Sequence, residues 1–313
     1  MENEPMTTTS SSESDVVGEE HWIDKDDVKL FLWEKFVGTP AGKKGTIVFV
    51  HGSSMGSQPT FDLHVEGRPF SSAMNWFAVQ GYDTWSVDME GYGRSDKHRD
   101  IASNISDGAD DLELATAYIQ KLRNCGPLLV YGISSGALRA AMFAERHPER
   151  VERLALDAMV WTGEGSPTLE QRRKKLPEFL KHRRRPINRD FVMSIFTRDH
   201  AETAEQSVIE AYADAILAQD DSIPNGTYID MCQHLPVVDP EKITVPTIIM
   251  RGEHDGIASI EDLMAFFLKL PNADKQFTVM PGLAHSSFQQ KNYMMIYDVL
   301  ETFFSRPKPV YLG

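Results

Sequence analysis

The sequence is poor in cysteine and in long apolar runs. Its 313 residues include only two cysteines, Cys125 and Cys232, which offer neither a disulfide framework nor the spacing of a metal site. No apolar segment approaches the roughly 20 residues that a membrane-spanning helix needs. The sequence therefore predicts a soluble protein of the reducing cytoplasm, with no metal site and no contact with a membrane.

Positive charge is missing from the first twenty residues. This stretch contains six acidic residues and no Lys or Arg, and it lacks the apolar run of a secretory signal. We expect residues 1–20 to form a disordered acidic tail. The formal net charge of the whole chain is −14, which argues against nucleic acids as partners. A small-molecule substrate is the expected partner, and the sequence leaves a homodimer open.

Short apolar runs alternate with helical patterns along most of the chain. Runs typical of strands occur at residues 27–38, 45–52, 82–88, 127–132, 153–161, 245–252 and 275–282. The first of these runs alternates like an edge strand. Helical patterns occur at residues 107–124, 136–150, 259–271 and 292–304. Because strands that alternate with helices form crossover units, we predict an α/β fold with a mostly parallel central sheet and helices on both faces.

The alternation stops between residues 159 and 238, where the periodicity is helical. We predict a helical insertion there, which divides the α/β core into residues 21–158 and residues 239–313. Capping side chains predict where its helices begin. These caps are Ser166, Asn188 and Asp199.

Charge is unevenly distributed within this insertion. Residues 172–189 carry nine Lys or Arg and one acid, whereas residues 199–230 carry eight acids and no Lys or Arg. Two solvated helical faces that attract each other explain this pattern. A basic lining that draws in an anionic substrate is the alternative.

The pattern G-x-S-x-G occurs where a buried strand meets a helical pattern, with Ser134 between Gly132 and Gly136. Exposing a hydroxyl at such a turn strains the backbone by about 1–3 kcal/mol, and glycines remove the clashes between strand and helix. The start of the helix also directs N–H groups at any negative charge that develops above the serine. The pattern predicts that Ser134 is a nucleophile.

A serine nucleophile needs an imidazole to take its proton and a carboxylate to orient that imidazole. Asp255 and His285 each follow a buried strand, and the order Ser, Asp, His is the one expected on this architecture. Asp157, at the end of an earlier strand, is an alternative acid. Glu253 and His254 are neighbours of the favoured one.

Hydrolysis also needs two donors for the oxyanion that forms on attack. The backbone N–H of Ser135, directly after the nucleophile, is one candidate. The second is the backbone N–H of Ser53, which follows His51 and Gly52 after an early strand. An ordinary Gly/Ser turn is the alternative explanation of this loop.

Residues 88–96 contain glycines but no complete G-x-G-x-x-G pattern and no acidic residue at the usual distance. We interpret them as a structural turn after a strand. No cofactor is therefore expected.

Together, these motifs resemble the α/β-hydrolase fold family from about residue 21 onward. The motifs HGSS, DMEGYGRSD, GISSG, RGEHD and GLAH stand where that family carries its oxyanion loop, a fourth-strand turn, the nucleophile elbow, the acid and the histidine. The resemblance implies that Ser134 is the nucleophile, His285 the general base and acid, and Asp255 the orienting carboxylate. It also implies that the insertion is a lid. Ile133 departs from the family, since many relatives have a polar residue there.

Two segments are expected to contribute the substrate pocket. In the long stretch 54–76, Ser54, Met55 and Phe61 are candidates. The aromatic residues of the insertion are expected to pack mainly between lid and core, with some of them, Trp161 first, lining the cavity. These aromatics are Trp161, Phe179, Phe191, Phe196 and Tyr212.

The leading hypothesis is a serine hydrolase that cleaves a small or medium carboxylic ester, or a lactone, through an acyl-enzyme. One alternative is a C–C bond hydrolase of ring-fission diketones that uses the same triad. Another is a ligand-binding sensor with a slow or silent triad. The triad alone does not separate esters from amides or thioesters.

Overall fold

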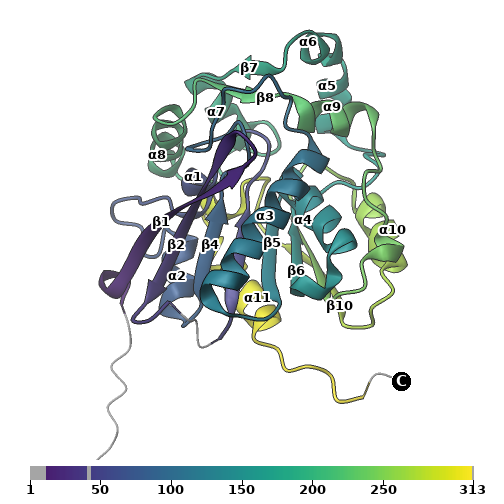
Figure 1. Cartoon of the computed structure of the whole chain (residues 1–313). Helices are drawn as coiled ribbons and strands as arrows, with labels where there is room; N and C mark the ends of the chain where they lie inside the picture. Colours follow the sequence, from purple (N-terminus) through teal and green to yellow (C-terminus); the bar gives the residue numbers. More distant parts are fainter. Residues whose placement is uncertain (1–11, 41–43, 312–313) are drawn as a thin grey trace, which may run out of the picture.

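A computed structural model describes residues 12–40 and 44–311. An eight-stranded sheet in the order β1-β2-β4-β3-β5-β6-β9-β10 runs through the centre of the molecule (Figure 1). β2 pairs antiparallel with β1 and β4, and every other neighbouring pair is parallel. The prediction of a mostly parallel sheet is confirmed. The strands are β1 (Val16–Lys25), β2 (Val28–Val37), β3 (Thr46–Val50), β4 (Asp83–Val87), β5 (Leu128–Ile133), β6 (Val151–Asp157), β9 (Thr247–Gly252) and β10 (Lys275–Met280).

Both faces of the sheet are buried, because consecutive side chains of a strand point to opposite faces. In β3, Ile47 and Phe49 belong to one apolar cluster, whereas Val48 and Val50 belong to the other. The first cluster also contains α2 (Ala73–Val79) and α11 (Tyr293–Phe304), and the second contains α3 (Ile105–Arg123), α4 (Ser135–Arg146) and α10 (Ile260–Lys269). Burial on both faces explains why the central strands are continuous apolar runs in the sequence.

The predicted tail boundary at residue 20 is wrong for the residues that the structure describes. A 3-10 turn at Glu13–Asp15 leads into β1, which pairs with β2 along its whole length. The Glu20 carboxylate accepts hydrogen bonds of 2.6 and 2.7 Å from Arg94, so its charge is paired with a distant residue. Residues 1–11, also assigned to the tail, lie outside the described residues.

The prediction of an edge strand at residues 27–38 is also wrong. This segment is β2, which has β1 on one side and β4 on the other. The edge strand on this side of the sheet is β1. Its only partner in the sheet is β2, the next strand in the sequence.

Between β6 and β9 the described chain forms helices and a short two-stranded antiparallel sheet, drawn at the top of Figure 1. Two of the predicted starts agree with the structure: Ser166 accepts a hydrogen bond from the Leu169 N–H, and Asn188 accepts one from the Phe191 N–H. The pairing of β7 with β8 was not predicted. The elements are α5 (Pro167–Arg173), α6 (Leu176–Lys181), β7 (Arg184–Pro186), α7 (Arg189–Thr197), α8 (Gln206–Leu217), β8 (Ser222–Pro224) and α9 (Gly226–Gln233).

The predicted helix start at Asp199 is wrong. Helix α8 begins at Gln206, and the side chain of Glu205, the residue before it, makes no capping hydrogen bond. Asp199 instead accepts hydrogen bonds from the side chains of Arg198 and Thr168, at 3.2 and 3.3 Å. A short polar side chain can serve any nearby donor, so the capping preference alone did not determine its partner.

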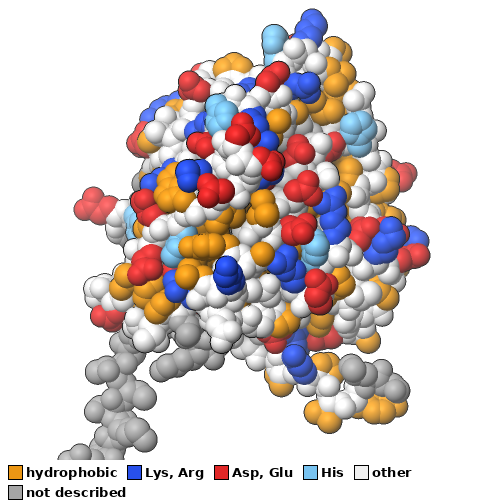
Figure 2. All heavy atoms as spheres, in the orientation of Figure 1, with side chains coloured by type: hydrophobic (Ala, Val, Ile, Leu, Met, Phe, Trp, Pro, Cys, Tyr) orange, Lys and Arg blue, Asp and Glu red, His pale blue; other side chains and the backbone are white. Residues whose placement is uncertain are grey.

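The excess of negative charge is not gathered into one patch on the face shown in Figure 2, where acidic and basic side chains are interspersed. Within residues 12–40 and 44–311, no helix combines the length and the apolar character needed to cross a bilayer.

Candidate active site

Ser134 lies at the sharp turn between β5 and α4, with a φ of 58° and a ψ of −125°. The positive φ is strained for a residue with a side chain. The flanking glycines allow the turn to close. A β-carbon on Gly132 would lie 2.4 Å from the carbonyl oxygen of Gly136, and one on Gly136 would lie 2.2 Å from that of Val50.

The structure brings Ser134, His285 and Asp255 into one hydrogen-bonded chain, although they are far apart in the sequence. His285 Nε2 lies 2.9 Å from Ser134 Oγ, and His285 Nδ1 lies 3.0 Å from Asp255 Oδ1. An ionised carboxylate can only accept, so Nδ1 carries the proton and donates it to Asp255. Nε2 is then the acceptor of the Ser134 hydroxyl, which is the arrangement of a general base.

Asp255 is held as a buried carboxylate. Burial raises its pKa, but His285 and the N–H of Ile257, which donates to Oδ1 at 3.0 Å, outweigh this effect and keep the pKa below its ordinary value. The acid is therefore ionised at neutral pH and orients the imidazole through one oxygen.

Asp157, Glu253 and His254, the rivals and neighbours of Asp255, face other partners. Asp157 is buried and accepts a hydrogen bond of 2.6 Å from the Tyr131 hydroxyl; burial raises its pKa to about 6. Glu253 accepts the N–H of Gly282 at 2.8 Å. The ring of His254 stacks on that of His200, with centroids 4.0 Å apart. None of the three has a hydrogen bond to His285 in the structure.

Two backbone N–H groups near Ser134 have no acceptor within the described part of the chain. They belong to Ser53, in the loop after β3, and to Ser135, the first residue of α4. The Ser53 hydroxyl donates to the Ser135 hydroxyl at 2.6 Å, so the two residues are adjacent. This pair of free donors is the arrangement that a developing oxyanion requires.

A neutral histidine supports the Ser53 loop. His51 is fully buried, and burial together with Arg139 lowers its pKa to about 3. Its Nδ1 lies 2.8 Å from the Gly52 carbonyl oxygen, and its Nε2 accepts the N–H of Met89 at 3.1 Å. Nδ1 therefore carries the proton and donates it to Gly52. Because Nε2 accepts from Met89, His51 ties the loop to the turn after β4.

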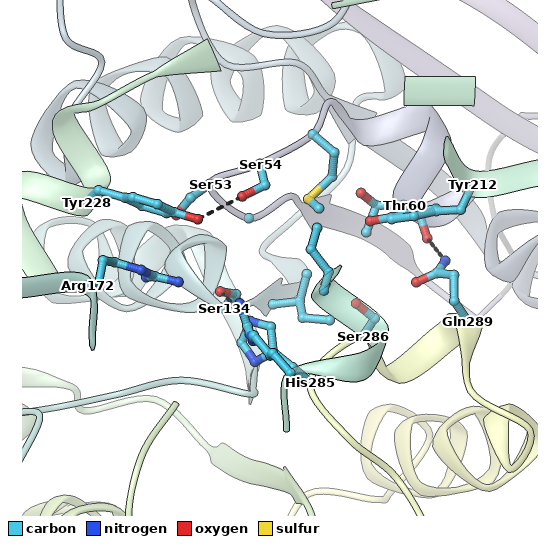
Figure 3. Close-up of a pocket in the computed structure, with 15 residues that line it drawn as sticks. Ser53, Ser54, Thr60, Ser134, Arg172, Tyr212, Tyr228, His285, Ser286 and Gln289 are labelled. Carbon is cyan, nitrogen blue, oxygen red and sulfur yellow. Dashed lines mark hydrogen bonds between the residues drawn. The ribbon is translucent and has the colours of Figure 1, made fainter. Parts of the chain in front are cut away.

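A cavity opens directly above Ser134 (Figure 3). Ser54 and Met55 line it, as do Arg172, Arg198, Tyr212 and Tyr228 of the insertion. The remaining lining residues are Gly52, Ser53, Thr60, Ile133, Ser134, Ile195, His285, Ser286 and Gln289.

Two predicted pocket residues do not line this cavity. The Trp161 indole N–H donates to the Val238 carbonyl at 3.2 Å, and its ring packs edge-on against Phe266. Phe61 is fully buried in the apolar cluster around Phe49. Both aromatic side chains pack against apolar neighbours. Burial of apolar surface favours such positions over the lining of a polar cavity.

Sequence reasoning missed the two most unusual residues of the cavity, Arg172 and Tyr228. The guanidinium carbons of Arg172 and Arg185 lie 3.8 and 3.6 Å from the centre of the Tyr228 ring. Two groups at this distance would overlap on the same face, so they lie on opposite faces. The only signal in the sequence was the basic character of residues 172–189.

We expect Tyr228 to ionise near neutral pH. Burial raises its pKa, but Arg172 and Arg185 more than offset this and lower the pKa to about 7. The near-ultraviolet absorbance of tyrosinate should therefore rise as the pH increases through about 7, and Tyr228→Phe should remove this rise. Tyr212→Phe is the matched control, since Tyr212 lines the same cavity but burial raises its pKa. An unchanged titration in Tyr228→Phe would contradict the assignment.

The fold and this site define an α/β hydrolase, and the comparisons with known proteins agree. The family model described as serine aminopeptidase, S33, matches residues 41–292, so the chain belongs to that family. The predictions of the α/β-hydrolase fold and of a hydrolase are confirmed.

Solved structures of several hydrolases have similar folds. A monoacylglycerol lipase from Paleococcus ferrophilus is 17% identical, with a TM-score of 0.65 over 88% of this chain and 98% of that chain. A thermophilic esterase from Thermogutta terrifontis is 18% identical, with a TM-score of 0.63 over 91% and 99%. The thioesterase domain from the curacin biosynthetic pathway is 17% identical, with a TM-score of 0.63 over 91% and 99%. At these identities the likeness establishes the fold, and the substrate does not follow from it.

Proposed function

We propose that the protein is a serine hydrolase that cleaves a small or medium carboxylic ester, or a lactone, through an acyl-enzyme. The observation that carries this proposal is the hydrogen-bonded chain from Ser134 through His285 to Asp255. Ser134 also lies at a strained turn, beside two N–H groups that have no acceptor among the described residues, which adds support.

In the proposed reaction, Ser134 Oγ attacks the ester carbonyl carbon while His285 Nε2 takes the hydroxyl proton. The N–H groups of Ser53 and Ser135 stabilise the oxyanion. His285 then gives its proton to the leaving alcohol, and the acyl group remains on Ser134. A water molecule, deprotonated by His285, releases the acid and restores the serine.

Fluorophosphonate labelling tests whether Ser134 is an activated nucleophile. We expect one phosphonyl adduct per folded chain, formed on Ser134 Oγ with loss of fluoride and located by peptide mass spectrometry. Unfolded protein should not react, because its serine has no neighbouring imidazole. Folded protein without an adduct on Ser134 would contradict the proposal and favour a binding protein with a silent triad.

A C–C bond hydrolase of ring-fission diketones is a second candidate. It is favoured by the arginines that line the cavity, since such substrates are acidic. Loss of the dienoate absorbance of a ring-fission product on addition of the protein would support it. Turnover of aryl esters alone, with the dienoate unchanged, would support the ester hydrolase.

A further inference from the structure

The cavity above Ser134 is positively charged, although the chain has a net charge of −14. Its lining includes Arg172 and Arg198 and no Asp or Glu. A second cavity shares Arg172, Arg198 and Tyr228 with it, and is therefore adjacent. Its lining adds Lys175 and Arg185 against Glu178 and Asp199. Cationic side chains therefore outnumber carboxylates in the lining of both cavities.

Most arginines of the insertion are committed to contacts within the protein. Arg185 donates to the carbonyl oxygens of Pro224 and Ser53, at 2.7 and 3.1 Å, and so supports the oxyanion loop. Arg198 is paired with Asp199 at 3.2 Å. Arg185 thus uses both of its Nη groups on the protein, and the charge of Arg198 is already paired with a carboxylate.

Arg172 differs from these arginines. Its only hydrogen bond within the described residues is a contact of 3.9 Å from Nη1 to the Met231 sulfur, and no carboxylate of that part of the chain is within ion-pair distance. Figure 3 shows the guanidinium directed into the cavity on the side of Ser134. Its remaining donors are therefore available to a bound molecule.

Arg172 is also held in place before any ligand binds. Its guanidinium stacks on Tyr228, whose hydroxyl lies 3.2 Å from the Ser54 hydroxyl in the same cavity. Burial lowers the pKa of Arg172, because no carboxylate replaces the lost solvation, yet a guanidinium stays charged at neutral pH. A partly buried guanidinium with no carboxylate partner among the described residues is costly, and an anionic ligand would reduce that cost.

We propose that the substrate carries a carboxylate group that Arg172 binds while Ser134 attacks the ester carbonyl. This inference rests on the proposed function and specifies its substrate class. The planar guanidinium fits a carboxylate through two parallel hydrogen bonds. Arg172 is therefore a specificity-determining residue, and an ester without a negative charge should be a poorer substrate.

Matched esters test this specificity. The probes are the mono-4-nitrophenyl esters of adipic, pimelic and suberic acid, each compared with its neutral methyl diester. For the native chain we expect kcat/KM to favour the acid over the methyl diester by at least about tenfold, the discrimination typical of a charge-assisted hydrogen bond. In Arg172→Gln this ratio should fall to near one, and Arg172→Lys should restore part of it.

Arg173→Gln is the matched control, because it removes the same charge from the next position of α5 and Arg173 lines neither cavity. It should leave the ratio unchanged. An equal ratio in the native chain and in Arg172→Gln would overturn the inference, while turnover of the diester would leave the proposed function standing.

If neither ester is hydrolysed, the proposed function fails. A binding measurement then tests separately whether Arg172 recognises a carboxylate. Titration calorimetry would then measure binding of the suberate monoester and its methyl diester to the Ser134→Ala protein. We expect the monoester to bind more tightly by about tenfold, and the added Arg172→Gln substitution to remove this preference. Equal affinities for the two compounds would overturn the inference.

Discussion

Ser134→Ala is expected to lower kcat for aryl ester hydrolysis by a factor on the order of 10⁴ to 10⁶. The substitution removes Oγ, which accounts for the 2.9 Å contact with His285 Nε2. Without that atom no acyl-enzyme forms, and only the oxyanion donors and substrate binding remain to accelerate attack by water.

Folding should be little affected by this substitution. Alanine keeps the β-carbon, so the strain of the positive φ remains, and one hydrogen bond of about 1 kcal/mol is lost. The midpoint of thermal unfolding should therefore stay close to that of the native chain. Ser207→Ala, at an exposed position of α8, is the matched control and should retain full activity. Ester hydrolysis by Ser134→Ala within tenfold of the native rate would rule Ser134 out as the nucleophile.

Gly136→Ala is expected to destabilise the protein by roughly 3 kcal/mol or more, at the upper end of overpacking effects. The added β-carbon would lie 2.2 Å from the Val50 carbonyl oxygen and 2.5 Å from that of His51. Both contacts are with backbone atoms, so no side chain can rotate away. Relief requires α4 to move from β3, which would also displace the Ser53 loop and the serine.

Helix propensity predicts the opposite sign, which makes this test informative. Gly136 lies in the first turn of α4, where alanine would be favoured over glycine by up to about 1 kcal/mol. Gly126→Ala is the matched control, since a β-carbon there has no neighbour within 4 Å. Denaturant unfolding of both variants measures the effect. A Gly136→Ala protein as stable as the native chain would show that the close approach of α4 to β3 is not needed.

The strained turn at Ser134 and the strands of the sheet could be predicted because their signals are local. The glycines that allow the turn are within two residues of Ser134, and each apolar run of the sheet spans only a few residues. The order of the sheet and its edge strand were not predictable in this way. β1 was hidden in an acidic segment whose Glu20 is paired with Arg94, 74 positions away.

The choice between two acids shows a different limit. Asp157 is the last residue of β6 and Asp255 follows β9, both parallel strands, so the sequence pattern suits either of them. The structure gives the Asp157 carboxylate to the Tyr131 hydroxyl and the Asp255 carboxylate to His285. The direction of each side chain, rather than its position at the end of a strand, determines which of the two acids contacts His285.

By itself, the sequence determined the class of fold, the strained serine turn and the basic character of the insertion, because periodicity and backbone sterics act between near neighbours. Only the tertiary structure decided that Trp161 packs into the core and that Arg172 faces the cavity with no carboxylate partner among the described residues. The physical reason is that burial and ion pairing depend on which distant segments pack together, and a charge pattern along the chain does not specify that packing.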